Sequence, residues 1–219
     1  MKTVLALLAS LFVVIPSALA EPTSQEQSLY DDLRSEFEDI DVQTRDVGDV
    51  LRSFDEPITI SFPCDADDAH TAVTSTITTK LARFDAGLTH NEGAITGGIY
   101  VWKCSITVSG GQVNIKCENE LMLNSAAILA STEKDPRIKE VEDLVILYHE
   151  LLHGQLMIDA IKSSDSWRDN ACNKQPNSDL DYSYTDADHL VITPLQTEFA
   201  DRLILQNGGT MKVEQINPQ

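Results

Sequence analysis

The chain has 219 residues, of which 42% are hydrophobic, and its formal net charge at pH 7 is −19. A chain of this length can bury a sizeable core and suits one domain or two closely packed lobes. The strong negative charge argues against nucleic acid or anionic lipid as a partner, because both carry charge of the same sign.

The N-terminus has the pattern of an export signal. Lys2 is followed by an apolar stretch from Val4 to Ile15, and the small-residue pattern Ala18-Leu19-Ala20 comes next. The apolar stretch is short for a membrane span, and the Ala-x-Ala pattern is typical of a cleavage site. We therefore expect residues 1–20 to be removed, leaving a secreted or extracytoplasmic protein without a membrane anchor.

The next part of the chain is predicted to hold two helices and one strand. A helix is expected from Ser28 to Asp39, within residues 21–48, which form either a structural helical segment or a removable pro-segment. Ile58–Phe62 alternates as a strand. Asp67–Phe84 is predicted to be a helix, although its many threonines have a low helix propensity. Residues 49–219 are assigned to a single domain.

A β-hairpin is predicted around two adjacent glycines. Tyr100–Val108 and Gln112–Cys117 alternate like strands, and Gly110-Gly111 between them is typical of a two-residue turn. With that turn Ser109 faces Gln112. Counting outward then places Cys104 opposite Cys117, at a non-hydrogen-bonded position where side chains approach closely.

The cysteine content predicts two disulfides. The chain has four cysteines, and an even number in an exported protein indicates a disulfide framework. The hairpin register predicts a Cys104–Cys117 bond, which leaves Cys64 to pair with Cys172. A cysteine metal site is the rival interpretation, and the lack of a C-x-x-C spacing argues against it.

The strongest helical pattern follows a short segment, residues 121–132, that is read as either a brief helix or an extended link. Asp135-Pro136 is a good helix start, because proline is favoured at the first helical position. The helical pattern then runs from Ile138 to Lys162. Between Leu144 and Ile158 it is apolar almost all round, so we expect this helix to be buried on most sides.

The remainder of the chain is predicted to hold a loop and one more helix. Residues 163–188 are polar and acidic and are expected to form a long loop. A calcium site at residues 177–188 is conceivable, but a solvated acidic loop is the simpler interpretation, because the spacing matches no EF-hand. Thr193-Pro194 is expected to begin a last helix that Gly208-Gly209 closes.

His149-Glu150-Leu151-Leu152-His153 forms the H-E-x-x-H pattern inside the buried helix. Residues four apart lie on the same face, so both imidazoles can reach one metal ion. Glu150 lies on a neighbouring part of the surface, where its carboxylate can accept a proton from metal-bound water. The alternative is coincidence, which would leave three polar groups buried at a cost. The pattern therefore predicts one Zn²⁺ per chain.

This motif helix resembles that of the zincin metallopeptidases. The resemblance covers the motif and extends toward residue 202, and residues 21–120 match no member of the family. It implies that His149 and His153 are zinc ligands and that Glu150 is the catalytic base. It also implies that one sheet edge lies beside the metal and takes an extended peptide as an added strand. Gly97–Lys103 is the candidate for that edge.

The third ligand distinguishes the branches of the family. One branch continues the motif to a glycine and a further histidine, and this chain has Leu156 and Asp159 at those positions. Asp159 is kept as an alternative ligand or a supporting residue. On an unbroken helix, however, it points away from the metal face.

The gluzincin branch, which takes a glutamate from a later helix, is slightly favoured. Glu198 resembles that ligand, and Asp201 resembles the aspartate that orients a histidine ligand, although it follows after three residues where the family has four. The simpler interpretation of Glu198 is an ion pair with Arg202. His189 is a further alternative ligand. His189, Tyr182 and Tyr184 are also candidates to stabilise the transition state.

These observations predict an α+β fold, in which a small antiparallel sheet with a disulfide-tied hairpin packs on the buried motif helix. The predicted function is hydrolysis of a peptide or protein substrate by zinc-activated water, with Glu150 as the general base. Two other classes remain open. One is an exported zinc-binding module without peptidase activity, and the other is a structural protein without metal.

Overall fold

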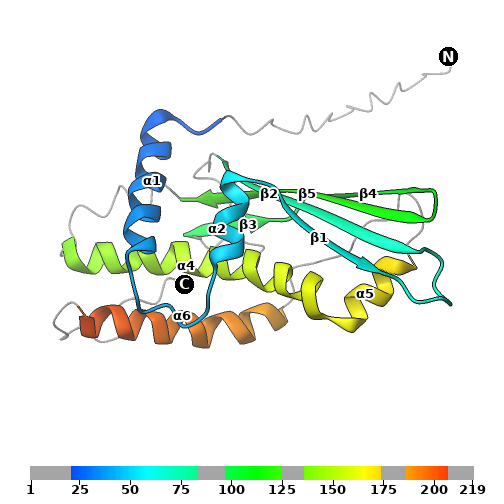
Figure 1. Cartoon of the computed structure of the whole chain (residues 1–219). Coiled ribbons are helices and arrows are strands. Elements are labelled where there is room, and N and C mark those ends of the chain that lie inside the picture. Colours follow the sequence, from blue (N-terminus) through cyan, green and yellow to red (C-terminus); the bar gives the residue numbers. More distant parts are fainter. Residues whose placement is uncertain (1–20, 83–96, 125–135, 174–185, 207–219) are drawn as a thin grey trace, which may run out of the picture.

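The computed structural model describes residues 21–82, 97–124, 136–173 and 186–206. Within these ranges the chain forms five helices, namely α1 (Ser24–Glu38), α2 (Gly48–Asp55), α4 (Pro136–Ser163), α5 (Asp165–Cys172) and α6 (Asp186–Gln206). It also forms five strands, namely β1 (Ile58–Pro63), β2 (Ala72–Ala82), β3 (Gly98–Val101), β4 (Cys104–Ser109) and β5 (Gln112–Leu123). The predicted α+β class is confirmed (Figure 1).

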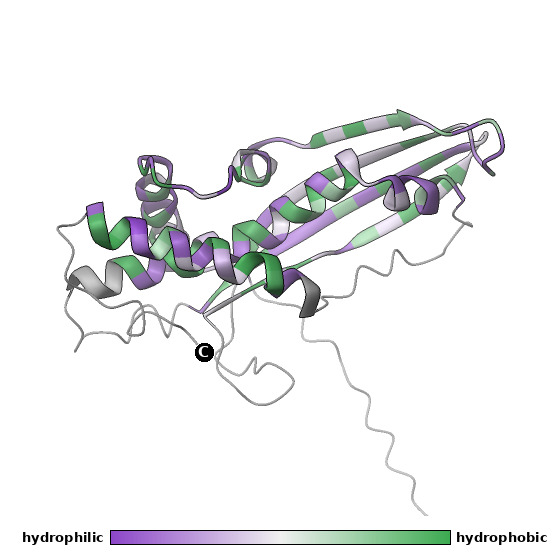
Figure 2. Cartoon of the chain, turned by 90° about the horizontal axis from the view of Figure 1, so that it is seen from below, coloured by the Kyte–Doolittle hydropathy of each residue, from purple (hydrophilic) through white to green (hydrophobic). Residues whose placement is uncertain are grey.

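The strands form one mixed sheet. Their order is β1-β2-β5-β3. Strand β4 pairs with the same edge of β5 as β3 does, but along the first half of β5, whereas β3 pairs with its last residues. The β2–β5 pair is parallel and the other pairs are antiparallel, so the expectation of a wholly antiparallel sheet misses one pairing. Hydrophobic and hydrophilic residues alternate along the strands, as a sheet with one covered face requires (Figure 2).

The predicted hairpin and both predicted disulfides are confirmed. Ser109 pairs with Gln112, and Cys104 pairs with Cys117 at the expected register. Gly110 and Gly111 have φ angles of 59° and 80°, the left-handed conformation that makes glycine the favoured residue in this turn. Cys104 is bonded to Cys117 and Cys64 to Cys172. The two disulfides indicate an oxidising, extracytoplasmic environment.

The helix predicted for Asp67–Phe84 is wrong, because Ala72–Ala82 forms strand β2. Its threonines, Val73 and Ile77 are β-branched and fit the pleated surface of a sheet. Burial alternates along the strand, with Val73 and Ile77 fully buried. Residues 83 and 84 lie outside the described residues.

Two boundaries near the C-terminus also differ from the prediction. Residues 165–172 form helix α5, whose first turn is capped because the Ser164 hydroxyl accepts a hydrogen bond from the Trp167 backbone N–H. Helix α6 begins at Asp186, before the predicted start, and contains Pro194 in its interior. The proline therefore does not mark the helix start, although it removes one backbone donor. The predicted closing glycines lie outside the described residues.

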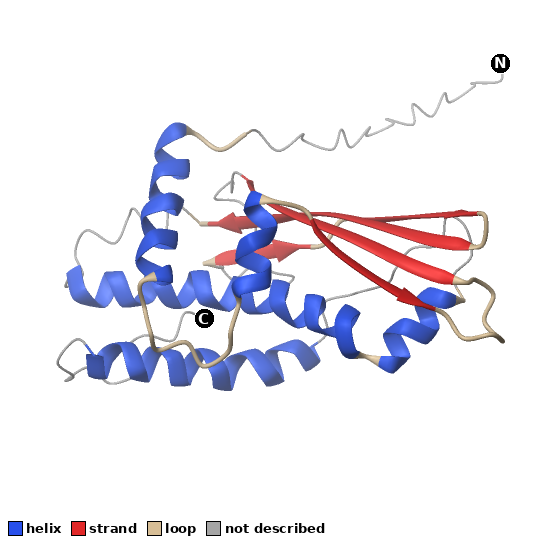
Figure 3. Cartoon of the chain, viewed as in Figure 1, coloured by secondary structure: helices blue, strands red, loops and turns tan. Residues whose placement is uncertain are grey.

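Helix α4 forms the centre of the protein. It lies between the sheet and α6, and α1 and α2 lie across it (Figure 3). Its segment Val141–Ser163 is long and apolar enough to cross a membrane, but 72% of the most apolar window is buried inside the protein. This burial is what the core helix of a folded domain shows, and it confirms the prediction of a buried motif helix.

The segment before residue 49 is part of this core. Helix α1 begins with a capping box, in which Thr23 and Glu26 exchange hydrogen bonds. The Phe37 ring is fully buried against the rings of Tyr148 on α4 and Phe199 on α6. Residues 21–48 thus cover the side of α4 that carries Tyr148.

Candidate metal centre

Helix α4 and strand β3 approach each other closely because small residues face large ones. Each contact sets a glycine against a larger residue, namely Gly97 against Ile146, Gly98 against Glu150 and Gly154 against Tyr100. On α4 these positions are four residues apart and form one stripe along β3. The predicted edge segment therefore lies directly beside Glu150.

This contact predicts unequal effects of two neighbouring substitutions. A Cβ at residue 98 would lie 2.7 Å from Cγ of Glu150, whereas one at residue 97 would lie 2.8 Å from Cδ1 of Ile146. We expect Gly98→Ala to lower the free energy of unfolding by about 1–3 kcal/mol, because Glu150 is buried and has little room to move. Gly97→Ala should cost less, because Ile146 is only partly buried and has more room to move than Glu150. Urea unfolding of both variants measures the difference, and equal effects would show that Gly98 is not a tight contact.

Three histidines converge between α4 and α6. His149 and His153 come from α4, and His189 comes from the first turn of α6. One ring nitrogen from each lies within 4.8 Å of the others. The ring centroids of His189 lie 5.4 Å from His149 and 5.1 Å from His153. These three residues could hold one metal ion.

The spacing of the first two histidines fits a shared ion. Nε2 of His149 and Nε2 of His153 lie 3.2 Å apart. Two imidazole nitrogens bound to one tetrahedral zinc ion would be separated by roughly 3.3–3.4 Å, given zinc–nitrogen distances of about 2.0–2.1 Å. The two atoms are therefore already close to the separation that such a site needs.

Burial keeps His149 and His153 in the neutral form that binds metals. It lowers the pKa of His149, and it lowers the pKa of His153 to about 3, with a further contribution from the neighbouring histidines. His153 is 6% exposed. A neutral imidazole has a free lone pair, whereas a protonated one has none to offer.

Glu150 lies beside the histidines and is 5% exposed. Its carboxylate accepts a hydrogen bond from the Tyr100 backbone N–H, which favours the charged form. Burial has the larger effect and raises the pKa of Glu150 to about 8. The Glu150 side chain is thus held between the motif helix and strand β3, with its pKa shifted toward the pH range in which a proton-transfer group works.

Of the candidates for the third ligand, Glu198 and Asp159 form ion pairs elsewhere, and His189 lies at the cluster. Glu198 is on an exposed face of α6, where its side chain is 54% exposed and pairs with Arg202. Asp159 pairs with Arg45 at 2.6 Å and accepts a hydrogen bond from Gln155. Among the described residues, the cluster around His149 therefore includes His189 and neither of these carboxylates.

The other predicted site residues are not at the histidine cluster or lie outside the described residues. Asp201 is exposed on α6. Tyr182 and Tyr184, together with most of the acidic loop at 177–188, lie outside the described residues. The predictions for both tyrosines and for calcium stay predictions.

One residue at the site was missed from the sequence. Oε1 of Gln196 lies 2.7 Å from Nδ1 of His149. Gln196 is seven residues after His189, a separation of about two helical turns, so both lie on one face of α6. That spacing was the available signal, but it has meaning only once His189 is known to face α4.

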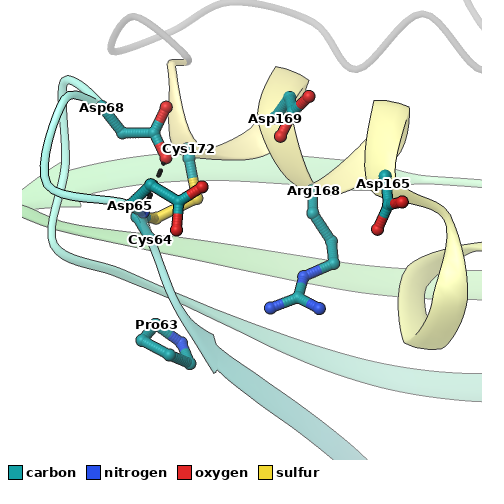
Figure 4. Close-up of a pocket in the computed structure, with 8 residues that line it drawn as sticks. All are labelled: Pro63, Cys64, Asp65, Asp68, Asp165, Arg168, Asp169 and Cys172. Carbon is teal, nitrogen blue, oxygen red and sulfur yellow. Dashed lines mark hydrogen bonds between the residues drawn. A yellow bond between two sulfur atoms is a disulfide. The ribbon is translucent and has the colours of Figure 1, made fainter.

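A second group of ligand-type residues lines a cavity at the far end of the sheet (Figure 4). The cavity is lined by Pro63, Cys64, Asp65, Asp68, Asp165, Arg168, Asp169 and Cys172. Both sulfur atoms are used in the Cys64–Cys172 disulfide, so they are not thiolate ligands. Asp68 accepts hydrogen bonds from the Asp65 backbone and from Asn173. The disulfide and the hydrogen bonds of Asp68 therefore have a structural role, because they tie the segment after β1 to the end of α5.

Comparison of the chain with known protein families, curated proteins and solved structures finds no match.

Proposed function

We propose that this protein is a zinc-dependent hydrolase that cleaves peptide bonds outside the cytoplasm. The observation that supports the proposal best is the convergence of His149, His153 and His189 next to the buried carboxylate of Glu150. Three neutral nitrogen ligands with one position left for water or substrate are typical of catalytic zinc sites.

The roles of the residues follow from their chemistry. His149, His153 and His189 would hold the ion through ring nitrogens. When bound there, zinc would supply a Lewis acid that polarises a carbonyl and activates water. Glu150 would accept a proton from the attacking water and pass it to the departing amine. Strand β3 would lie beside the substrate, because Gly98 and Tyr100 form the wall next to Glu150.

A second function is favoured by one specific observation. The Glu150 carboxylate is engaged by the Tyr100 backbone N–H and is almost completely buried. A carboxylate fixed in this way would serve to stabilise the contact between α4 and β3. The protein would then be an exported metal-binding module without hydrolytic activity.

Glu150→Gln separates the two functions. If the protein is a hydrolase, the Glu150→Gln variant should keep its zinc and lose activity by about 10²–10⁴-fold, because the amide cannot accept the proton. The assay would use purified protein loaded with zinc and a mixture of unstructured peptides, with cleavage followed by mass spectrometry. Glu142→Gln, on the same helix, is the control and should retain activity. If wild type binds zinc and cleaves nothing, or if the Glu150→Gln variant cleaves equally well, the peptidase proposal fails.

A further inference from the structure

Helix α6 contributes two groups to the metal centre. His189 supplies the third ring nitrogen, and Gln196 contacts the side of His149 that points away from His153. Nδ1 of His149 lies 2.7 Å from Oε1 of Gln196, while its Nε2 lies 3.2 Å from Nε2 of His153. The two nitrogens of His149 thus have different neighbours.

We propose that Gln196 is a positioning residue that fixes the tautomer of His149 for metal binding. The proposal rests on the metal site proposed above. A glutamine oxygen has no proton to give, so Nδ1 of His149 must donate. A neutral imidazole has one N–H, and its other nitrogen therefore carries the lone pair. This leaves Nε2 of His149 as the acceptor that faces His153 and a metal ion.

A second contact joins α4 and α6 next to the pair of His149 and Gln196. The Thr44 hydroxyl donates to the backbone oxygen of Leu195 at 2.9 Å, and it is also 2.9 Å from the Tyr148 hydroxyl. Tyr148 and His149 are adjacent on α4, just as Leu195 and Gln196 are adjacent on α6. The two helices are therefore joined twice at this level, once directly by His149 and Gln196 and once through Thr44.

The chemical nature of the partner has a consequence for the metal. A carboxylate in this position makes the imidazole a stronger ligand, because it attracts the proton on Nδ1. The glutamine amide is neutral and does so less. The Gln196 amide would therefore leave His149 a weaker ligand than a carboxylate partner would.

The test measures zinc affinity, and its control is another glutamine on the same helix. Gln196→Leu removes the acceptor and should weaken zinc binding by about 10–100-fold in competition with a chromophoric chelator. Gln196→Glu keeps an acceptor and should bind at least as tightly as wild type. Gln206→Leu changes an exposed glutamine at the end of α6 and should have no effect.

Long-range ¹H–¹⁵N spectra of the metal-free protein report the tautomer directly. We expect His149 to carry its proton on Nδ1 in wild type and in Gln196→Glu, and to lose that preference in Gln196→Leu. Unchanged zinc affinity in Gln196→Leu, or weakening in Gln196→Glu as large as in Gln196→Leu, would overturn the proposal. If zinc affinity depends on Gln196 but the wild-type protein cleaves no peptide, the proposal for Gln196 holds and only the proposed peptidase activity fails. If the wild-type protein binds no zinc, both the proposal for Gln196 and the proposed peptidase activity fail.

Discussion

His189→Ala is expected to abolish high-affinity zinc binding, whereas Glu198→Ala should leave it unchanged. His189 is one of three residues whose ring nitrogens converge, and Glu198 is exposed and paired with Arg202. Loss of a ligand should cost more than the roughly 10–100-fold that follows loss of an outer hydrogen-bond partner. Metal content of the purified variants, measured by mass spectrometry after dialysis against a chelator, gives the result.

A matched histidine controls for general effects of the substitution. His70 is not part of the cluster, so His70→Ala should retain about one zinc per chain, the stoichiometry of a single site. If Glu198→Ala loses zinc as completely as His189→Ala, the arrangement of α6 against α4 described above is incorrect. Loss of zinc in His189→Ala alone assigns the third ligand to histidine and sets this site apart from the glutamate-ligand pattern that its motif resembles.

Phe37→Ala is expected to lower the free energy of unfolding by about 3–5 kcal/mol, the cost of emptying a fully buried aromatic site. The Phe37 ring lies 5.6 Å from the ring of Tyr148 and 5.8 Å from that of Phe199. Its loss would leave a cavity between α1, α4 and α6. Equilibrium unfolding in guanidinium chloride measures the change, and Ser35→Ala, at an exposed position of the same helix, should be close to neutral.

This prediction also concerns the fate of residues 21–48. Their removal would expose Tyr148 and Phe199 and take away the hydrogen bonds that Thr44 and the Arg45 backbone make with the Tyr148 hydroxyl. We therefore propose that the segment stays in the working protein as a structural element. N-terminal sequencing of secreted protein should begin at Glu21. A stable, fully folded protein that begins after residue 48 would show instead that the segment is a removable pro-segment.

Local patterns predicted some parts of the protein correctly. The hairpin followed from Gly110-Gly111 and the alternation on either side, because a two-residue turn fixes the register of both strands. That register placed Cys104 opposite Cys117, and the remaining pair followed by elimination. The two histidines of the motif are four residues apart on one helix, so their common face depends on helix geometry alone.

Other features depended on packing between distant segments. Asp67–Phe84 is predicted to be a helix although its threonines have a low helix propensity. The parallel pairing of Ala72–Ala82 with β5 joins residues about forty positions apart, which no local pattern specifies. Thr193-Pro194 predicts a helix start that lies after the observed start at Asp186, because packing on α4 holds the helix on both sides of Pro194.

The sequence by itself determined that a buried helix presents His149, Glu150 and His153 in a pattern suited to zinc, in a chain with two disulfides. Only the tertiary structure decided which residue joins them. His189 and Glu198 are both on α6, nine residues apart, so they lie about two and a half turns from each other. The rotation and register of α6 against α4 bring His189 and Gln196 inward and leave Glu198 in solvent. That register is set by side-chain packing along the interface between the two helices, including Phe199 against Tyr148.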